Sequence, residues 1–75
     1  MNFLLPQERT GVVRLARAVD IHGDRYVDLA VELDDAPGEP KTGRISAGEC
    51  HAGLAPGARV RVRFVMGVMV SAKCE

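Results

Sequence analysis

Four side chains in this sequence are of the types that bind zinc or carry out covalent catalysis: His22, Cys50, His51 and Cys74. Structural zinc sites usually hold close ligand pairs that are separated by two to four residues. Cys50 and His51 are adjacent instead, and adjacent side chains in an extended chain point to opposite sides. The spacing therefore predicts no metal site. We expect the two thiols to be buried or incidental and the two histidines to lie on the surface.

A cysteine–histidine nucleophile pair, Cys50 with His22 or His51, is the one covalent catalyst that the sequence offers. Such a pair needs a third group to orient it and a sizeable pocket for the substrate. A chain of 75 residues has little volume for such a pocket. We therefore expect a protein that is not an enzyme and that has no cofactor.

Three arginines, Arg59, Arg61 and Arg63, alternate with apolar residues in the segment R-V-R-V-R-F. In a strand they share one face at intervals of about 6.6 to 7 Å, close to the repeat of an extended phosphate backbone. This spacing suits a nucleic-acid or phosphate ligand, with Tyr26 as the aromatic side chain available for base stacking. The alternative is that the arginines protect an edge strand and pair with the acidic face of the second strand, residues 26–33.

The run F-V-M-G-V-M-V at positions 64 to 70 is apolar without interruption. Side chains of a strand alternate between its two faces, so these cannot all lie inside one barrel. We expect the outward part of the run to form a partner interface together with the apolar N-terminus. The expected interface residues are Phe3, Leu4, Leu5, Met66 and Met69. The alternative is a buried last strand in which the methionines fill gaps in the core.

Length and composition limit the function classes further. The chain has 75 residues, 47% of them hydrophobic and 27% charged, which is typical of one globular domain. Ten basic and ten acidic residues leave no net charge, which argues against a protein that binds polyanions over its whole surface. The N-terminus lacks the basic region of a secretory signal, and no apolar run is long enough to span a bilayer. We expect a cytoplasmic protein with reduced thiols and no membrane association.

Alternating apolar and polar residues predict five short strands. The clearest is residues 26–33, where valines and leucines occupy every second position. In residues 11–21 the same spacing favours a strand with Val13, Leu15, Val19 and Ile21 on one face, and a helix is the alternative. The five expected strands span residues 11–21, 26–33, 41–46, 58–64 and 65–73.

Two segments in the second half of the chain contain residues that predict a helical turn and a hairpin turn or bulge. Ser46 and Glu49 match the spacing of a capping box, which predicts one helical turn over residues 47–52. Gly67 predicts either the turn of a tight hairpin or a bulge within one long strand.

Five short strands with one helical turn before the fourth favour a small antiparallel sheet that curls into a partly closed barrel, because an open sheet leaves costly edges. The order of the elements fits an OB-fold-like barrel, whose helix falls between strands three and four. An SH3-like barrel is the alternative. We expect one domain over residues 1–75, with residues 1–8 as an N-terminal arm.

Three stretches of the chain carry a resemblance to a known family. They are Y-V-D-L-A-V-E-L-D-D-A-P from Tyr26, G-R-I from Gly43 and G-L-A-P-G-A-R-V-R-V-R-F from Gly53. Together they resemble the OB-fold domain of acyl-CoA-associated accessory proteins, in which the barrel usually follows a rubredoxin-like zinc ribbon. The chain has no Cys-x-x-Cys pair, so nothing about the metal carries over. The resemblance implies an accessory or binding barrel, with an acyl-CoA or other small ligand.

Together these observations favour a non-enzymatic, OB-like accessory module that acts through protein–protein contacts, with a protein partner or a second copy of itself. The alternative is a barrel that binds single-stranded nucleic acid or a phosphate ligand weakly. The residues expected to do so are Arg59, Arg61, Arg63 and Tyr26.

Overall fold

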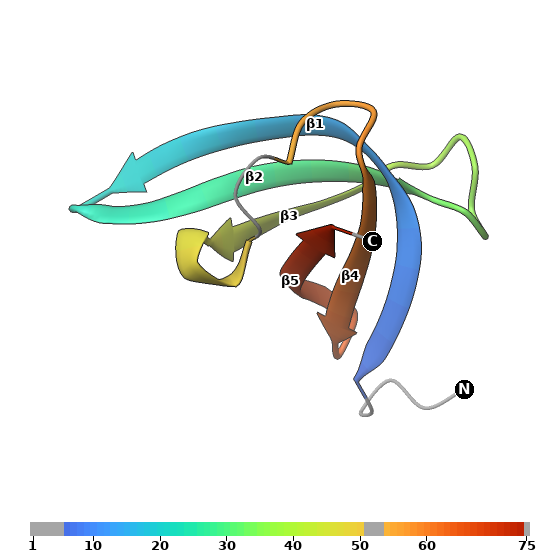
Figure 1. The fold of residues 1–75 in the computed structure, drawn as a ribbon. Helices are drawn as coiled ribbons and strands as arrows, with labels where there is room; N and C mark the ends of the chain where they lie inside the picture. The colour runs from blue at the N-terminus through green and yellow to red at the C-terminus, as the bar shows by residue number, and fades with distance from the viewer. Residues whose placement is uncertain (1–5, 51–53, 75) are drawn as a thin grey trace.

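In the computed structural model the described residues are 6–50 and 54–74, and they form five β-strands and one short 3-10 helix (Figure 1). In chain order these are β1 (Gln7–Ile21), β2 (Asp24–Leu33), β3 (Lys41–Ser46), η1 (Ala47–Glu49), β4 (Arg59–Val65) and β5 (Val68–Cys74). The antiparallel strands and the position of η1 between β3 and β4 confirm the fold class predicted from the sequence.

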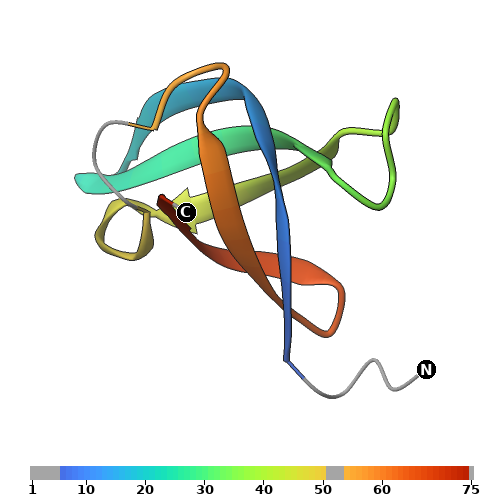
Figure 2. The same cartoon turned by 45° about the vertical axis from the view of Figure 1, so that its right-hand side comes forward.

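One antiparallel sheet holds the strands in the order β3-β2-β1-β4-β5. β1 is long enough to pair with β4 through its first half, from Gln7 to Val12, and with β2 from Gly11 onward. Figure 2 shows β1 bending between these two partners. The sheet therefore curls until β3 packs against β5, although no ladder joins these two strands. This is a partly closed barrel with β1 in the middle of the strand order.

A β-bulge at Arg14 bends β1. Successive residues of β2 pair with Val13 and Leu15, so Arg14 is the extra residue on β1. The bulge moves the inward face from Val13, which is buried, to Ala16, which packs against the core. Leu15 is exposed instead, so the prediction that it shares the inner face with Val13 is wrong.

A two-residue turn joins β4 to β5. Val65 pairs with Val68, and the turn residues Met66 and Gly67 have φ angles of 53° and 79°. Positive φ at both central residues is typical of a type I′ turn, whose twist matches that of the strands it joins. Gly67 therefore belongs to a hairpin turn, and the bulge lies elsewhere, at Val70, where the pairing of β5 with β4 shifts by one residue.

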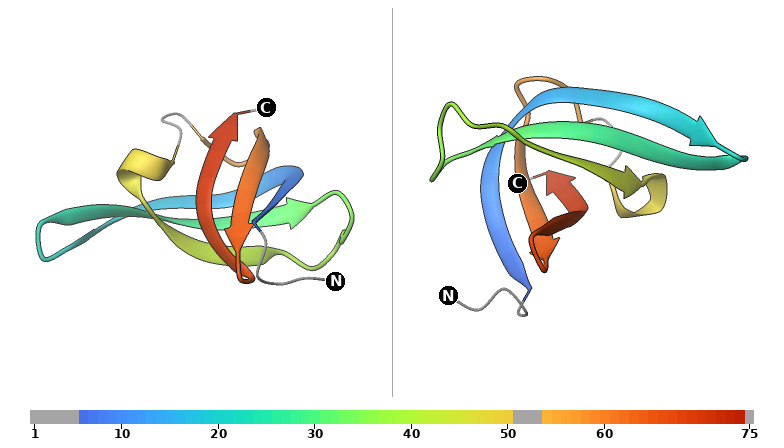
Figure 3. Two further views of the ribbon diagram at one scale, coloured as in Figure 1. Left: turned by 90° about the horizontal axis from the view of Figure 1, so that it is seen from below. Right: turned by 180° about the vertical axis from the view of Figure 1, so that it is seen from behind.

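The core lies between the two halves of the curled sheet, and Figure 3 shows β4 and β5 crossing the part formed by β1, β2 and β3. Every strand contributes to it, and the alternation predicted for β2 and β4 is confirmed by their burial. The buried side chains are Val13, Leu29, Val31, Leu33, Ile45, Val60, Val62, Phe64, Met69 and Ala72.

The boundaries of β1 and of η1 differ from those that the sequence predicts. β1 begins at Gln7, so the last two residues of the expected N-terminal arm belong to a strand. The helix alternative for residues 11–21 is wrong. η1 is a single short turn, and Ser46 makes no side-chain capping hydrogen bond, so the predicted capping box is wrong as well. Residues 51–52 of the expected turn lie outside the described residues.

Candidate functional site

The three arginines of β4 are exposed and alternate with buried residues, as the sequence predicts, but they have different partners. Arg59 forms a bidentate ion pair with Asp34, directly after β2, with nitrogen–oxygen distances of 2.6 and 2.9 Å. Thr10 donates a hydrogen bond to the same carboxylate at 2.8 Å. The hydrogen bonds from Arg59 and then from Thr10 hold the pKa of Asp34 below its ordinary value. Arg59 therefore pairs with an acid in the loop after β2, and not with the acidic face of that strand as the alternative expected.

Arg61 and Arg63 stand in two rows of outward side chains that cross the strands. Read from β1 through β4 to β5, the rows are Glu8, Arg63 and Ser71, and then Thr10, Arg61 and Lys73. Neither arginine forms an ion pair with any of the described residues. A pocket of about 190 Å³ is lined by Glu8, Arg61, Lys73 and Cys74. Arg61 and Lys73, which form no ion pair among the described residues, thus face each other beside a small depression.

Tyr26 lies apart from the arginines. It is half-buried on the outward side of β2, opposite Val19 on β1 and Ser46 on β3. The row that contains Arg59 meets β2 at Glu32. That position is six residues further along the strand, or roughly 20 Å. The structure therefore does not bring Tyr26 and the three arginines into one site.

The structure divides the predicted partner interface. Met66 is exposed at the hairpin turn, whereas Met69 is only 3% exposed and lies in the core, next to Gly43 of β3. The prediction that Met69 faces a partner is therefore wrong, and the alternative of a methionine that fills the core is confirmed for this residue. The other predicted interface residues, Phe3, Leu4 and Leu5, lie outside the described residues.

Two valines that the sequence reasoning did not single out lie on the outer surface of the same hairpin. Val68 and Val70 are both exposed. The length of the turn sets this arrangement, because a two-residue turn pairs Val65 with Val68 and the next residues of each strand then point inward. A hairpin turn that ends in glycine is the sequence signal from which these positions could have been found.

We call the outer side of β4 and β5 the hairpin face. Its apolar end, next to the turn, consists of Val65, Met66, Val68 and Val70. Its basic end consists of Arg61, Arg63 and Lys73, with Ser71 between them. The two ends are continuous along the paired strands, which run side by side in both views of Figure 3.

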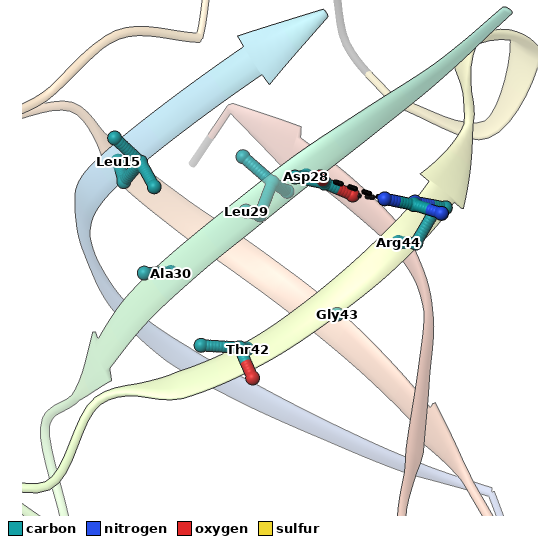
Figure 4. Close-up of a pocket in the computed structure, with 7 residues that line it drawn as sticks. All are labelled: Leu15, Asp28, Leu29, Ala30, Thr42, Gly43 and Arg44. Atoms are coloured by element: carbon teal, nitrogen blue, oxygen red, sulfur yellow. Dashed lines mark hydrogen bonds and ion pairs between the residues drawn. The ribbon is translucent and has the colours of Figure 1, made fainter. Parts of the chain in front are cut away.

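A second surface lies on the outer side of β1, β2 and β3, and Figure 4 shows the side chains around its pocket. This pocket has a volume of about 430 Å³, is open to solvent, and includes one row formed by Leu15, Ala30 and Thr42. At its rim Arg44 donates two hydrogen bonds to Asp28, at 2.7 and 3.0 Å, and they lower the pKa of that carboxyl. This surface does not follow from the sequence pattern, because only the bulge at Arg14 turns Leu15 outward.

Cys50 packs partly buried against the core and forms an isolated β-bridge with Ala72. Burial raises the pKa of its thiol, which lowers the fraction of nucleophilic thiolate at neutral pH. Cys50 and Cys74 do not form a disulfide with each other. Within residues 6–50 and 54–74, no three His, Cys, Asp or Glu side chains lie close enough together to hold a metal ion, and His51 lies outside these ranges.

In the part of the chain that the structure describes, no helix is long and apolar enough to cross a membrane. The resemblance to acyl-CoA-associated accessory proteins stays a prediction. No protein-family model, curated protein or solved structure matches the chain.

Proposed function

We propose that this protein is a non-enzymatic binding module whose hairpin face contacts a protein partner. One observation carries the proposal: of the four large hydrophobic side chains that are exposed among the described residues, three lie on this face. They are Met66, Val68 and Val70, with exposed fractions of 64%, 61% and 36%. Apolar side chains that gather on one surface of a small domain are typical of interaction sites.

Covering these side chains stabilises a complex. Complete burial of one valine or methionine side chain is worth about 1.5 to 3 kcal/mol. The apolar end is also held in a defined conformation, because Val65 and Val68 pair in the ladder and Phe64 and Met69 pack beneath them in the core. A surface that is already ordered loses little conformational entropy when a partner binds.

The chemistry of the remaining surface supports binding rather than catalysis. The carboxylate at the rim of the larger pocket is occupied by the Asp28–Arg44 ion pair. Burial of the Cys50 thiol disfavours its nucleophilic form. We place the protein in the cytoplasm, because its two cysteines are not joined and thiols persist in a reducing compartment.

Single-stranded nucleic acid or another phosphate ligand is the alternative. Arg61, Arg63 and Lys73 favour it, since they form no ion pair with the described residues. Base stacking requires an aromatic ring near the cations, and Tyr26 lies on a different part of the sheet. Arg59, the third cation of the predicted site, is held in an ion pair. For these reasons the alternative ranks second.

Site-directed photocrosslinking in the natural host tests the proposed function. A photoreactive residue replaces Val68 in one variant and Leu15 in the control variant, because Leu15 is also exposed but lies on the outer side of β1. We expect protein adducts from position 68 and few from position 15, since only the first lies on the hairpin face. The adduct mass distinguishes a second copy of the chain from a different protein. Equal adduct formation at both positions, or none at position 68, contradicts the proposal.

A further inference from the structure

The hairpin face joins an apolar end to a basic end, and this combination indicates the chemistry of its partner. We propose that the face binds an extended protein segment in which acidic side chains follow apolar ones. The inference rests on the proposed function and adds to it the kind of partner. It depends on which cations form no ion pair with the described residues, where these cations lie, and which side chains lie beside them.

The basic end holds most of the cations that have no ion pair among the described residues. Five of the ten Lys and Arg side chains form ion pairs there. Of the other five, Arg17 lies on β1 and Lys41 on β3, and three lie together on the hairpin face. These three are Arg61, Arg63 and Lys73. A chain with no net charge overall thus keeps one face positive.

Two of these cations stand directly opposite each other. Arg61 on β4 pairs with Lys73 on β5, and like charges in opposite positions of a ladder repel each other. Glu8, opposite Arg63, is the one carboxylate in the two rows, so three cations face a single negative charge. The pocket of about 190 Å³ beside Arg61 and Lys73 gives a partner's carboxylate room to approach both. Its binding relieves the repulsion, which makes acidic groups the favoured ligands.

The two ends of the face follow each other at the spacing of an extended chain. Counted back from the turn, the first three outward residues of β4 are Val65, Arg63 and Arg61. Alternate residues of a strand lie about 6.6 to 7 Å apart, and an extended partner repeats its side chains at the same interval. A partner segment matches this spacing when its apolar side chain lies over Val65 and Val68. Its carboxylates then lie over the next two rows, which contain Arg63 and Arg61.

A second copy of this chain and a nucleic acid fit the face less well. Apart from Glu8, the described carboxylates that form no ion pair are spread over separate elements: Asp24 begins β2, Glu39 lies between β2 and β3, and Glu49 ends η1. None of these elements offers a run of acids. Among the described residues no aromatic side chain lies on the hairpin face, since Phe64 points into the core, so bases have no ring to stack on.

Selection from a random peptide display library tests the inference, with the full chain as bait and the library as probe. We expect the unmodified chain to enrich peptides that combine Asp or Glu with apolar residues at alternate positions. A variant with Arg61→Glu and Lys73→Glu should shift the enriched charge from acidic to basic. A control variant with Arg17→Glu and Lys41→Glu carries the same change in net charge away from the face and should keep the acidic preference.

Binding of one selected peptide, measured by fluorescence anisotropy, then gives magnitudes. Replacing Arg61 and Lys73 by glutamine should weaken the affinity about tenfold, because both contacts are charged and lie at the rim of the apolar patch. Val68→Glu and Val68→Thr should weaken it as well, and circular dichroism shows which variants remain folded. A labelled fifteen-nucleotide oligothymidine and vesicles with anionic lipid serve as competing probes.

The outcomes separate this inference from the proposed function. Enriched peptides that are apolar but not acidic, or a charge preference that the reversal variant does not change, overturn the acidic partner and leave protein binding in place. No enrichment at all, or enrichment that folded Val68 variants do not alter, overturns both. Tighter binding of the oligonucleotide or of the vesicles than of every selected peptide overturns the acidic segment in favour of a phosphate-bearing partner.

Discussion

At the scale of single residues, Gly43 of β3 packs closely against Met69 of β5 across the open side of the barrel. A Cβ atom added to Gly43 would lie 2.8 Å from the Cβ of Met69, well inside the normal separation of nonbonded carbons. The missing side chain at Gly43 therefore makes room for the methionine. This packing brings the two edge strands together and buries the side chain of Met69 in the core.

We predict that Gly43→Ala lowers the free energy of unfolding by about 1 to 3 kcal/mol, because β3 and β5 must move apart to admit the methyl group. Gly48→Ala is the matched control, since an added Cβ there meets nothing within 4 Å. Its effect should stay within about 0.5 kcal/mol. Urea unfolding followed by circular dichroism measures both values. Equal effects would contradict the close packing of β3 on β5.

At the scale of elements, the two hairpins use the same kind of turn. His22 and Gly23 join β1 to β2 with φ angles of 51° and 86°, and Met66 and Gly67 join β4 to β5 with 53° and 79°. Asparagine is the residue best suited to the first position of such a turn, because other side chains adopt positive φ at a cost. Met66 adopts the strained positive φ, and its exposed apolar side chain lies at the end of the hairpin face.

Asparagine substitutions separate the stability of the turn from its function. Met66→Asn and His22→Asn should each raise the free energy of unfolding by about 0.5 to 1 kcal/mol, because both relieve strain at a positive φ. Only Met66→Asn should weaken binding of a peptide selected on the hairpin face, since His22 lies on the other hairpin. Urea unfolding and anisotropy measure the two effects. A Met66→Asn variant that gains stability and binds as before would remove Met66 from the binding surface.

At the scale of the whole molecule, ion pairs tie together segments that are distant in the sequence. The loop after β2 is joined to β4 through Asp34 and Arg59, and to β1 through Asp35 and Arg9. Further pairs join β2 to β3 and β1 to β2. Hydrogen bonds from the arginines lower the pKa of each of the carboxylates concerned: Asp28, Glu32, Asp34 and Asp35.

These lowered pKa values predict acid sensitivity with a definite sign. The ion pairs contribute stability above the ordinary carboxyl pKa, which is 3.8 for Asp34, and this stability is lost as the pH falls through the lower pKa of the folded state. Arg59→Gln should raise the pKa of Asp34 toward 3.8 and make the acid-induced loss smaller. Arg61→Gln is the control, because Arg61 forms no ion pair among the described residues. Carboxyl NMR titration and urea unfolding at decreasing pH check both; an unchanged Asp34 pKa in Arg59→Gln would contradict the pairing.

Local residue patterns are enough to predict which segments are strands and which of their side chains alternate. This succeeded for β2 and β4, because the period of two is a local property of an extended chain. The same patterns also predict that Arg59, Arg61 and Arg63 share one face, and that the apolar run after them cannot be wholly buried.

Which side chains reach the surface, and which charges pair with one another, depends on the tertiary fold. Bulges at Arg14 and Val70 shift the pairing by one residue, and a shift of one residue reverses the face of every side chain beyond it. The partner of Arg59 comes from a segment 25 residues away, so no local pattern separates Arg59 from Arg61. Alternation depends on neighbouring residues, whereas register and ion pairing depend on how distant segments of the chain pack together.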